Sequence, residues 1–272
     1  MTCVADIQDF LINLAPPELA ESWDNVGLLT GDPTFQVEKI LTCLTLTPDV
    51  AAEAIAAGAS LIVSHHPILF RPVQQITTAS SEGKMLLDLI QARVSVYSPH
   101  TCYDSAERGI NWQLASLLGL ENVGILRPQT VSAESAPEQG AGRFGDLPAE
   151  FSLAQLNQLI KQALKIENLQ FVGDPAMRVR RLGIACGAAA EFLKDADKHE
   201  CQALLTGEAR FHACLEARSR EMALILPGHY ATERPAMEQM AELLQQQFPE
   251  LTIWASEEES DPVGWDCDGE SA

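Results

Sequence analysis

Short apolar runs alternate along this chain with segments whose apolar residues have helical spacing. Residues 39–47 and 60–64 are rich in β-branched and aliphatic side chains, and residues 48–57 between them have the pattern of a helix. Gly58 follows that helix, and glycine is common just past a helix C-terminus. This strand–helix–strand order predicts parallel strands joined by right-handed crossovers, as in α/β folds.

The same alternation continues through the rest of the chain. Further helices are predicted over 5–14, 82–92, 109–118, 153–164, 188–199 and 209–220, and a last long helix follows Thr232 to about residue 247. Further strands are predicted at 27–29, 94–97, 121–127, 169–172, 178–185, 203–205, 223–226 and 251–255. Ser152 and Thr232 have side chains suited to capping the helices that follow them.

One segment interrupts this pattern and divides the chain. Residues 129–142 are rich in Ser, Ala, Glu, Pro and Gly and lack apolar periodicity, so they are predicted to be a linker. The division gives a first α/β lobe over 1–128, a second over 143–255 and an acidic, mostly solvated tail over 256–272. Since each lobe repeats a similar order of elements, we expect two similar lobes, each a mostly parallel sheet flanked by helices.

The composition of the chain argues against several functional classes. The 272 residues carry a net charge of −20 and no Lys/Arg-rich run, which argues against nucleic-acid binding and against an anionic membrane surface. No stretch is long and apolar enough to span a bilayer, and the N-terminus lacks the basic region of a signal peptide. Seven cysteines without C-x-x-C pairing predict reduced thiols and a cytoplasmic location.

The histidines are placed where an α/β fold would bind a ligand. Four of the six fall at predicted strand ends: His65, His66, His100 and His229. Ligands bind just beyond the carboxyl ends of strands in open α/β sheets, so these positions predict a site. His100 is followed four residues later by Asp104, and His229 is followed four residues later by Glu233. That spacing is about one helical turn, so each histidine and its carboxylate can face the same way.

Histidine and carboxylate side chains together suit zinc, iron or manganese as bound ions. The candidate ligands are His65, His66, Asp104, His229 and Glu233, with His100 close by. A catalytic metal takes about three protein ligands, so this set is too large for one open site. Bridging carboxylates would allow it to hold two divalent ions, which can lower the pKa of a shared water to about 7. The competing interpretation is a set of scattered histidines and ordinary helix-cap acids.

Other polar residues near these motifs each have two interpretations. Glu208 is either a pocket acid or general base, or the N-cap of the next helix. His212, four residues after Glu208, either supports a ligand or lies exposed on a helix. Asp24 either borders the site or caps backbone amides, and capping is the interpretation we favour. The chain contains no P-loop, dinucleotide-binding or nucleophile-elbow motif.

Taken together, these motifs resemble the NGG1-interacting-factor-three-like family, whose members are also called GTP cyclohydrolase 1 type 2 homologues. The resemblance covers nearly the whole chain and is carried by WDNVGL at 23–28, SHHP at 64–67, His100-Thr101 with Asp104, TGE at 206–208 with His212, and GHYATE at 228–233. It implies a dinuclear site held by His65, His66, Asp104, His229 and Glu233, between two similar lobes of a ring-shaped homohexamer. The chain departs from the family at CGAAA, residues 186–190, where a more glycine-rich turn is usual.

Two functions are compatible with such a site. The first is a metal-dependent hydrolase, in which a metal-bridging hydroxide attacks an unidentified small-molecule substrate and Glu208 or His100 moves the proton. The second is a non-enzymatic metal-binding protein that assembles rings or has a regulatory role. Both predict two divalent ions per subunit, either zinc, iron or manganese. The enzyme name of the family does not by itself fix the reaction, because one fold hosts many chemistries.

Overall fold

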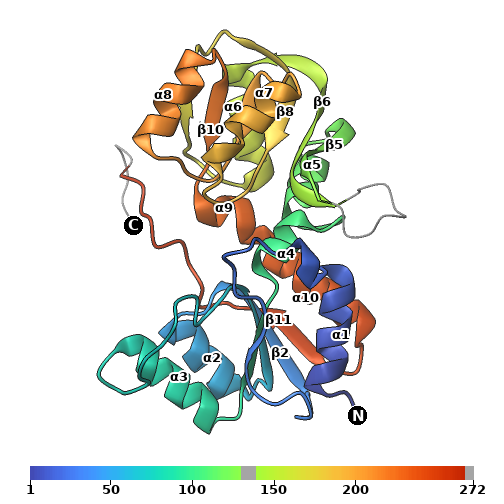
Figure 1. The fold of residues 1–272 in the computed structure, drawn as a ribbon, viewed down its shortest axis with the longest axis vertical. Helices are drawn as coiled ribbons and strands as arrows, with labels where there is room; N and C mark the ends of the chain where they lie inside the picture. The colour runs from blue at the N-terminus through green and yellow to red at the C-terminus, as the bar shows by residue number, and fades with distance from the viewer. Residues whose placement is uncertain (130–138, 267–272) are drawn as a thin grey trace.

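The computed structural model describes residues 1–129 and 139–266, which form two sheets covered by helices (Figure 1). The predicted α/β class is therefore confirmed. Within the described residues, no helix is both long and apolar enough to cross a membrane. The cysteines in the same residues are all free thiols.

The first sheet has five strands in the order β1–β4–β3–β2–β11. Their bounds are β1 (Gly27–Thr30), β2 (Lys39–Thr45), β3 (Leu61–His66), β4 (Ser95–Ser98) and β11 (Thr252–Ala255). All neighbouring strands are parallel except β1 and β4, as predicted for a mostly parallel sheet. In β2, Ile40 and Leu44 pack on one face while Leu41 and Cys43 pack on the other, because side chains alternate along a strand.

Helices cover both faces of this first sheet. They are α1 (Val4–Leu14) and α10 (Pro235–Gln247) on one face, and α2 (Pro48–Ala57) and α3 (Ser81–Gln91) on the other. The predicted start and end of α2 are confirmed. The Thr47 side chain accepts a hydrogen bond from Val50 N at the start, and Gly58 adopts a left-handed conformation with φ of 71° at the end.

The second sheet has six strands in the order β5–β6–β8–β9–β10–β7. Their bounds are β5 (Glu121–Pro128), β6 (Gly140–Ser152), β7 (Gln170–Val172), β8 (Arg178–Ile184), β9 (Ala203–Leu205) and β10 (Ala223–Leu226). Only the central strands β8, β9 and β10 are parallel to one another, and the outer pairs are antiparallel. The prediction of a mostly parallel second sheet is therefore wrong, because antiparallel strands extend the parallel core on both sides: β5 and β6 beyond β8, and β7 beyond β10.

The helices around this sheet also lie on two faces. They are α5 (Ile110–Leu117) and α6 (Leu153–Leu164) on one face, and α7 (Leu193–Lys198) and α8 (Phe211–Ser219) on the other. Ser152 caps α6 as predicted: its side chain accepts a hydrogen bond from Gln155 N, and the Gln155 side chain accepts one from Ser152 N. The remaining short helices are η1 (Pro17–Leu19), η2 (Ala190–Phe192), α4 (His100–Ser105) and α9 (His229–Glu233).

The longest strand, β6, is absent from the sequence prediction. It pairs with β5 on one side and β8 on the other, and its first residues, 140–142, fall in the segment predicted to be a linker. Glycines at 140, 142 and 145 hide the apolar alternation that identifies a strand. Residues 130–138 of that predicted linker lie outside the described residues.

Two strands belong to the lobe opposite to the one predicted. β5 falls within 1–128 but pairs in the second sheet, and β11 falls within 143–255 but pairs with β2 in the first sheet. The chain thus enters the second lobe after α4 and returns to the first through α9 and α10 (Figure 1). A division by sequence position assumes that each lobe is contiguous, and this fold does not meet that assumption.

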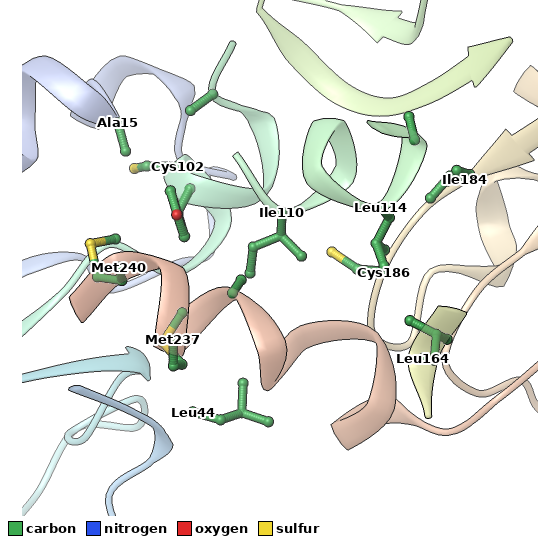
Figure 2. Close-up of a cluster of buried hydrophobic side chains, with 14 of the residues drawn as sticks. Ala15, Leu44, Cys102, Ile110, Leu114, Leu164, Ile184, Cys186, Met237 and Met240 are labelled. Carbon is green, nitrogen blue, oxygen red and sulfur yellow. The ribbon is translucent and has the colours of Figure 1, made fainter. Parts of the chain in front are cut away.

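The two lobes share one hydrophobic core. A single cluster of buried side chains joins α1 and the first sheet to α6 and the second sheet. Met237 and Met240 of α10 lie in this cluster, together with Leu44 of β2, Ile110 of α5 and Ile184 of β8 (Figure 2). Met237 and Met240 have no exposed surface, so α10 joins the two lobes through packing as well as through the chain.

The acidic tail is only partly solvated, which corrects the sequence prediction. Ser256 is 4% exposed, and the side chain of Glu259 is 3% exposed. Both residues contact strand β2 of the first lobe and Arg234, the residue between α9 and α10. Residues 267–272 of the predicted tail lie outside the described residues.

The shared core predicts that the two lobes unfold together. Met237→Ala would leave a cavity where both lobes meet and is expected to lower the free energy of unfolding by about 2–5 kcal/mol. Urea unfolding followed by circular dichroism and by tryptophan fluorescence would measure it. Gln239→Ala, on the exposed side of the same helix, is the matched control and should change stability little. Two separate transitions in the wild-type protein would contradict a shared core.

Candidate metal centre

Strand β3 carries two of the predicted ligands at its carboxyl end. The strand continues through both histidines, with Thr45 of β2 opposite His66. His65 is completely buried, whereas the side chain of His66 is 26% exposed. Their ring centroids lie 5.2 Å apart, so both imidazoles reach the same region at the end of the strand.

Two short helices bring in the other ligands. α4 begins at His100 and carries Asp104, and α9 begins at His229 and carries Glu233, each pair one turn apart as predicted. His229 Nε2 lies 2.9 Å from Glu233 Oε2. His100 holds a positive φ of 30°, which costs free energy for a residue with a side chain and is typical of functional sites.

The structure brings the predicted ligand set together in one place. His65 Nε2 lies 3.5 Å from Asp104 Oδ1 and 3.8 Å from Glu233 Oε2. His66 Nε2 lies 3.1 Å from the same Glu233 oxygen. Three groups of donor atoms lie within 4.8 Å of one another: His66 with His229 and Glu233, His65 with Asp104 and Glu233, and His65 with His66 and His100. Glu233 belongs to two of these groups, so its carboxylate stands between them.

The outer nitrogens of three histidines are held by neighbouring side chains. His66 Nδ1 lies 2.7 Å from Thr45 Oγ1, His100 Nδ1 lies 2.7 Å from Asp24 Oδ1, and His229 Nδ1 lies 3.1 Å from Glu208 Oε1. Each contact leaves Nε2 free to face the centre. This arrangement is the usual one around histidines that bind metals, where the second nitrogen is fixed by a carboxylate or another polar group.

The fourth histidine, His65, gives a direct test of whether the residues fit a metal ion. Its side chain is fully buried, yet neither ring nitrogen has a hydrogen-bond partner among the described residues. Buried polar atoms are almost always satisfied, and leaving one without a partner costs free energy. An ion bound by Nε2 beside Asp104 and Glu233 would satisfy that nitrogen, so the donor set fits a transition metal.

Burial and close charges shift the pKa values of the two carboxylates in opposite directions. Burial and the nearby charge of Glu233 raise the pKa of Asp104 to about 7. Burial also acts to raise the pKa of Glu233, but hydrogen bonds from His229 and His66 outweigh it and the pKa is lowered. Glu233 is thus an anion at neutral pH, and a nearby cation would favour the ionised form of Asp104 as well.

The histidines also differ in their proton affinity. Burial lowers the pKa of His65 well below its usual value, so the ring is neutral and able to bind a metal. Burial acts in the same direction on His229, but the hydrogen bond and charge of Glu233, together with those of Glu208, raise its pKa to about 9. A metal ion would compete with that proton for Nε2.

A glycine in the segment 186–190 makes close packing around the ligands possible. Gly187 has φ of 65°, and a Cβ atom there would lie 2.2 Å from Glu233 Oε1 and 3.3 Å from His229 Nε2. Its amide donates to Thr232 Oγ1. The hydroxyl of Thr232 donates in turn to His229 O. The prediction that Thr232 caps the last helix is therefore wrong. That helix is instead divided, with α9 ending at Glu233 and α10 beginning at Pro235.

The structure shows the contacts of the three residues for which the sequence left two roles open: Asp24, Glu208 and His212. Asp24 accepts a hydrogen bond from Thr101 N at the start of α4, as predicted for a cap, and it also holds His100. Glu208 contacts His229 rather than capping α8, whose N-cap is Arg210. His212 is exposed on α8, where its ring lies beside Phe211.

Sequence reasoning assigns no role at the site to two residues that touch the predicted ligands, Thr45 and Cys186. For Asp24 it offers both a place beside the site and amide capping, and the structure shows both. The Cys186 thiol donates to Asp104 Oδ1 at 3.2 Å. Pairing of β2 with β3 places Thr45 beside His66, so the predicted parallel sheet was the one signal that could have identified it.

A cavity of about 360 Å³ opens onto the ligands. His66, His100, Asp104, His229 and Glu233 line its floor, and the walls include Trp23, Arg127, Ala188 and Phe192. Trp23 is 58% exposed, and its ring contacts those of Phe70 and His100 at centroid distances of 5.9 Å and 6.0 Å. Arg127 is already paired with Asp195 at 2.6 Å, so this cation is not free to bind an anionic ligand.

Comparisons with known proteins agree with this architecture. A protein of Clostridium acetobutylicum named GTP cyclohydrolase 1 type 2 homolog is 32% identical over 242 residues, which cover 89% of each chain. NIF3-like protein 1 of Drosophila melanogaster is 30% identical, over 93% of this chain and 86% of that protein. The crystal structure of Staphylococcus aureus protein SA1388 superposes with a TM-score of 0.88 at 27% identity, covering 97% of this chain and 99% of that one.

A further solved structure, a Bacillus cereus protein related to NIF3, has a TM-score of 0.90 at 22% identity over 97% of this chain and 99% of that chain, and it supports the fold alone. The family model described as Duf34/NIF3 (NGG1p interacting factor 3) matches residues 2–262. Because this match spans nearly the whole chain, the protein belongs to the DUF34/NIF3 family.

Proposed function

We propose that this protein binds two divalent transition-metal ions in each subunit and uses them to hydrolyse a small-molecule substrate. The observation that carries the proposal is the position of Glu233, whose buried carboxylate is shared by two groups of donor atoms. One ion would be held by His66, His229 and Glu233. The other would be held by His65, Asp104 and Glu233. Mixed imidazole and carboxylate donors suit zinc, iron or manganese.

The cavity supports a catalytic role for this centre. Ions at its floor would supply Lewis acidity and lower the pKa of a coordinated water to about 7. The cavity is lined by the exposed ring of Trp23 as well as by polar side chains, which suits a small substrate with an apolar or aromatic part. The relatives named GTP cyclohydrolase 1 type 2 homolog carry a hydrolase name, which is compatible with this reaction class.

His100 is our candidate for proton transfer. Its Nδ1 contacts Asp24, and its ring lines the cavity. This leaves Nε2 available on the side of His65 and His66. Burial lowers its pKa, but the hydrogen bond to Asp24 and the charges of Asp104 and Asp24 outweigh burial and raise it. The raised pKa favours the protonated ring, which could donate a proton from Nε2 to a leaving group. Glu208 supports the reaction by orienting His229.

The shared carboxylate predicts how metal content responds to single substitutions. Glu233→Gln should lose both ions, because each of the two groups depends on that side chain, whereas Asp104→Asn should lose one. Elemental analysis of dialysed protein, expressed as ions per subunit, measures this. His212→Asn is the matched control and should keep two ions, since His212 is exposed on α8. Two ions retained in Glu233→Gln would refute the shared site.

The proposed role of His100 predicts loss of turnover without loss of metal. In a hydrolase panel with manganese, iron and zinc, His100→Gln should lower kcat by about 10²–10⁴-fold on any substrate that the wild type turns over. Metal content should stay at the wild-type value. Glu208→Gln should have a smaller effect, because its carboxylate is 61% exposed and contacts the site only through His229. Unchanged kcat in His100→Gln would exclude it as the proton donor.

We also propose a homohexamer, with metal-dependent assembly as the alternative function. Exposed apolar side chains on the contacting elements β7 and α8 support an interface between copies: Phe171, Phe211 and Leu215. Light scattering should give about six times the chain mass of 29.6 kDa. Chelation of the metal should leave that mass unchanged if the metal serves catalysis. Dissociation on chelation, together with an inactive panel, would favour the assembly function.

A further inference from the structure

The end of strand β2 is completed by a residue of the C-terminal tail. β11 pairs with β2 as far as Ala255 opposite Thr42, and Ser256 N donates to Thr42 O at 2.8 Å. Beyond that point the amides of Leu44 and Thr45 donate to the carboxylate of Glu259, at 2.9 Å and 2.6 Å. One side chain thus does for these two amides what a neighbouring strand would do.

Glu259 is also half of a buried ion pair. Its Oε2 lies 2.8 Å from Arg234 Nε, and the two side chains are 3% and 10% exposed. Arg234 NH2 donates to Ser256 O at 2.8 Å, so the guanidinium contacts the tail twice. Removing one partner of a buried pair leaves the other charge without compensation, which makes this contact sensitive to substitution.

Three of the residues that Glu259 contacts are each bonded or adjacent in the chain to a candidate metal ligand. Thr45, whose amide it accepts, holds His66 Nδ1 through its hydroxyl at 2.7 Å. Arg234 directly follows Glu233 in the chain. The backbone carbonyl of Glu259 accepts a hydrogen bond from the hydroxyl of Tyr230, the residue after His229, at 3.1 Å.

The tail segment has a second set of contacts with the first lobe, independent of those of Glu259. The carboxylate of Glu53 on α2 accepts hydrogen bonds from Trp254 Nε1, Ser256 Oγ, Glu257 N and Glu258 N. Glu259 N donates to Ser256 Oγ at 3.2 Å. Glu259 is therefore presented to the site from a fixed support on the first lobe.

We propose that Glu259 is a positioning residue for the metal centre, holding His66 through Thr45 and Glu233 through Arg234. The inference rests on the proposed metal binding. It assigns residues 256–259 of the tail to the framework of the site. Glu259 contacts Thr45, which holds His66 of β3, and Arg234, which follows Glu233 of α9, so it links the supports of two candidate ligands.

The test is metal affinity in Glu259→Gln. Glutamine keeps the size of the side chain but removes the charge that faces Arg234 and one acceptor for the amides of β2. Zinc affinity, measured by competition with a chromogenic chelator, is expected to fall about 10–100-fold, as when an outer partner of a ligand is lost. Glu258→Gln is the matched control, since the neighbouring side chain is exposed, and it should bind zinc like the wild type.

A double-mutant cycle separates positioning from general stability. Thr45→Val removes the hydroxyl that holds His66 but keeps the amide that donates to Glu259. If Glu259 acts partly through Thr45, the two substitutions together should weaken zinc binding by less than the product of their separate effects. A lower melting temperature in Glu259→Gln with unchanged zinc affinity of the folded protein would overturn the inference while leaving the proposed function intact.

Failure of the proposed function has a different signature. If the wild-type protein binds no zinc, nitrogen-15 NMR of the imidazole rings in the same protein decides whether Glu259 positions the site. The His66 Nδ1 signal should shift in Glu259→Gln, while that of His199, which bonds to Leu126 O elsewhere, should not. An unchanged His66 signal would overturn the inference.

Discussion

The arrangement of this protein depends on one buried carboxylate. The Glu233 side chain is 4% exposed, and burying a charge is costly unless partners surround it. Those partners come from both sides of the molecule: His65 and His66 at the end of β3, and His229 at the start of α9. The charge of Glu233 is therefore balanced only when the two sheets are close enough for these side chains to reach it.

The path of the chain meets this requirement. The second lobe is inserted between α4 and α9, the two short helices that carry the His-x-x-x-acid pairs. Both helices thus lie where the chain crosses between lobes, and α10 continues from α9 into the core that the lobes share. The shared core at this crossing holds the candidate ligands in place, since protein interiors are close-packed and transmit strain.

Around the ligands lies a second set of residues that fixes their orientation. Asp24, Thr45 and Glu208 each hold the outer nitrogen of one histidine. They come from a loop, a strand end and the segment after β9, so no single element supports the site. Glu259 of the tail contacts Thr45 and Arg234 from the far end of the chain, and these contacts bury a residue that was predicted to be solvated.

The sequence alone determined the α/β class, most helix and strand positions, and the side chains that gather at the site. Period-two and helical spacing report which residues are apolar on which face, and strand ends mark where ligands lie in such folds. Only the tertiary structure decided that β5 and β11 exchange lobes, that β6 is a strand, and that Asp24, Cys186 and Glu259 touch the site or its supports. These features depend on contacts between residues far apart in the chain, and the local spacing of apolar residues does not predict such contacts.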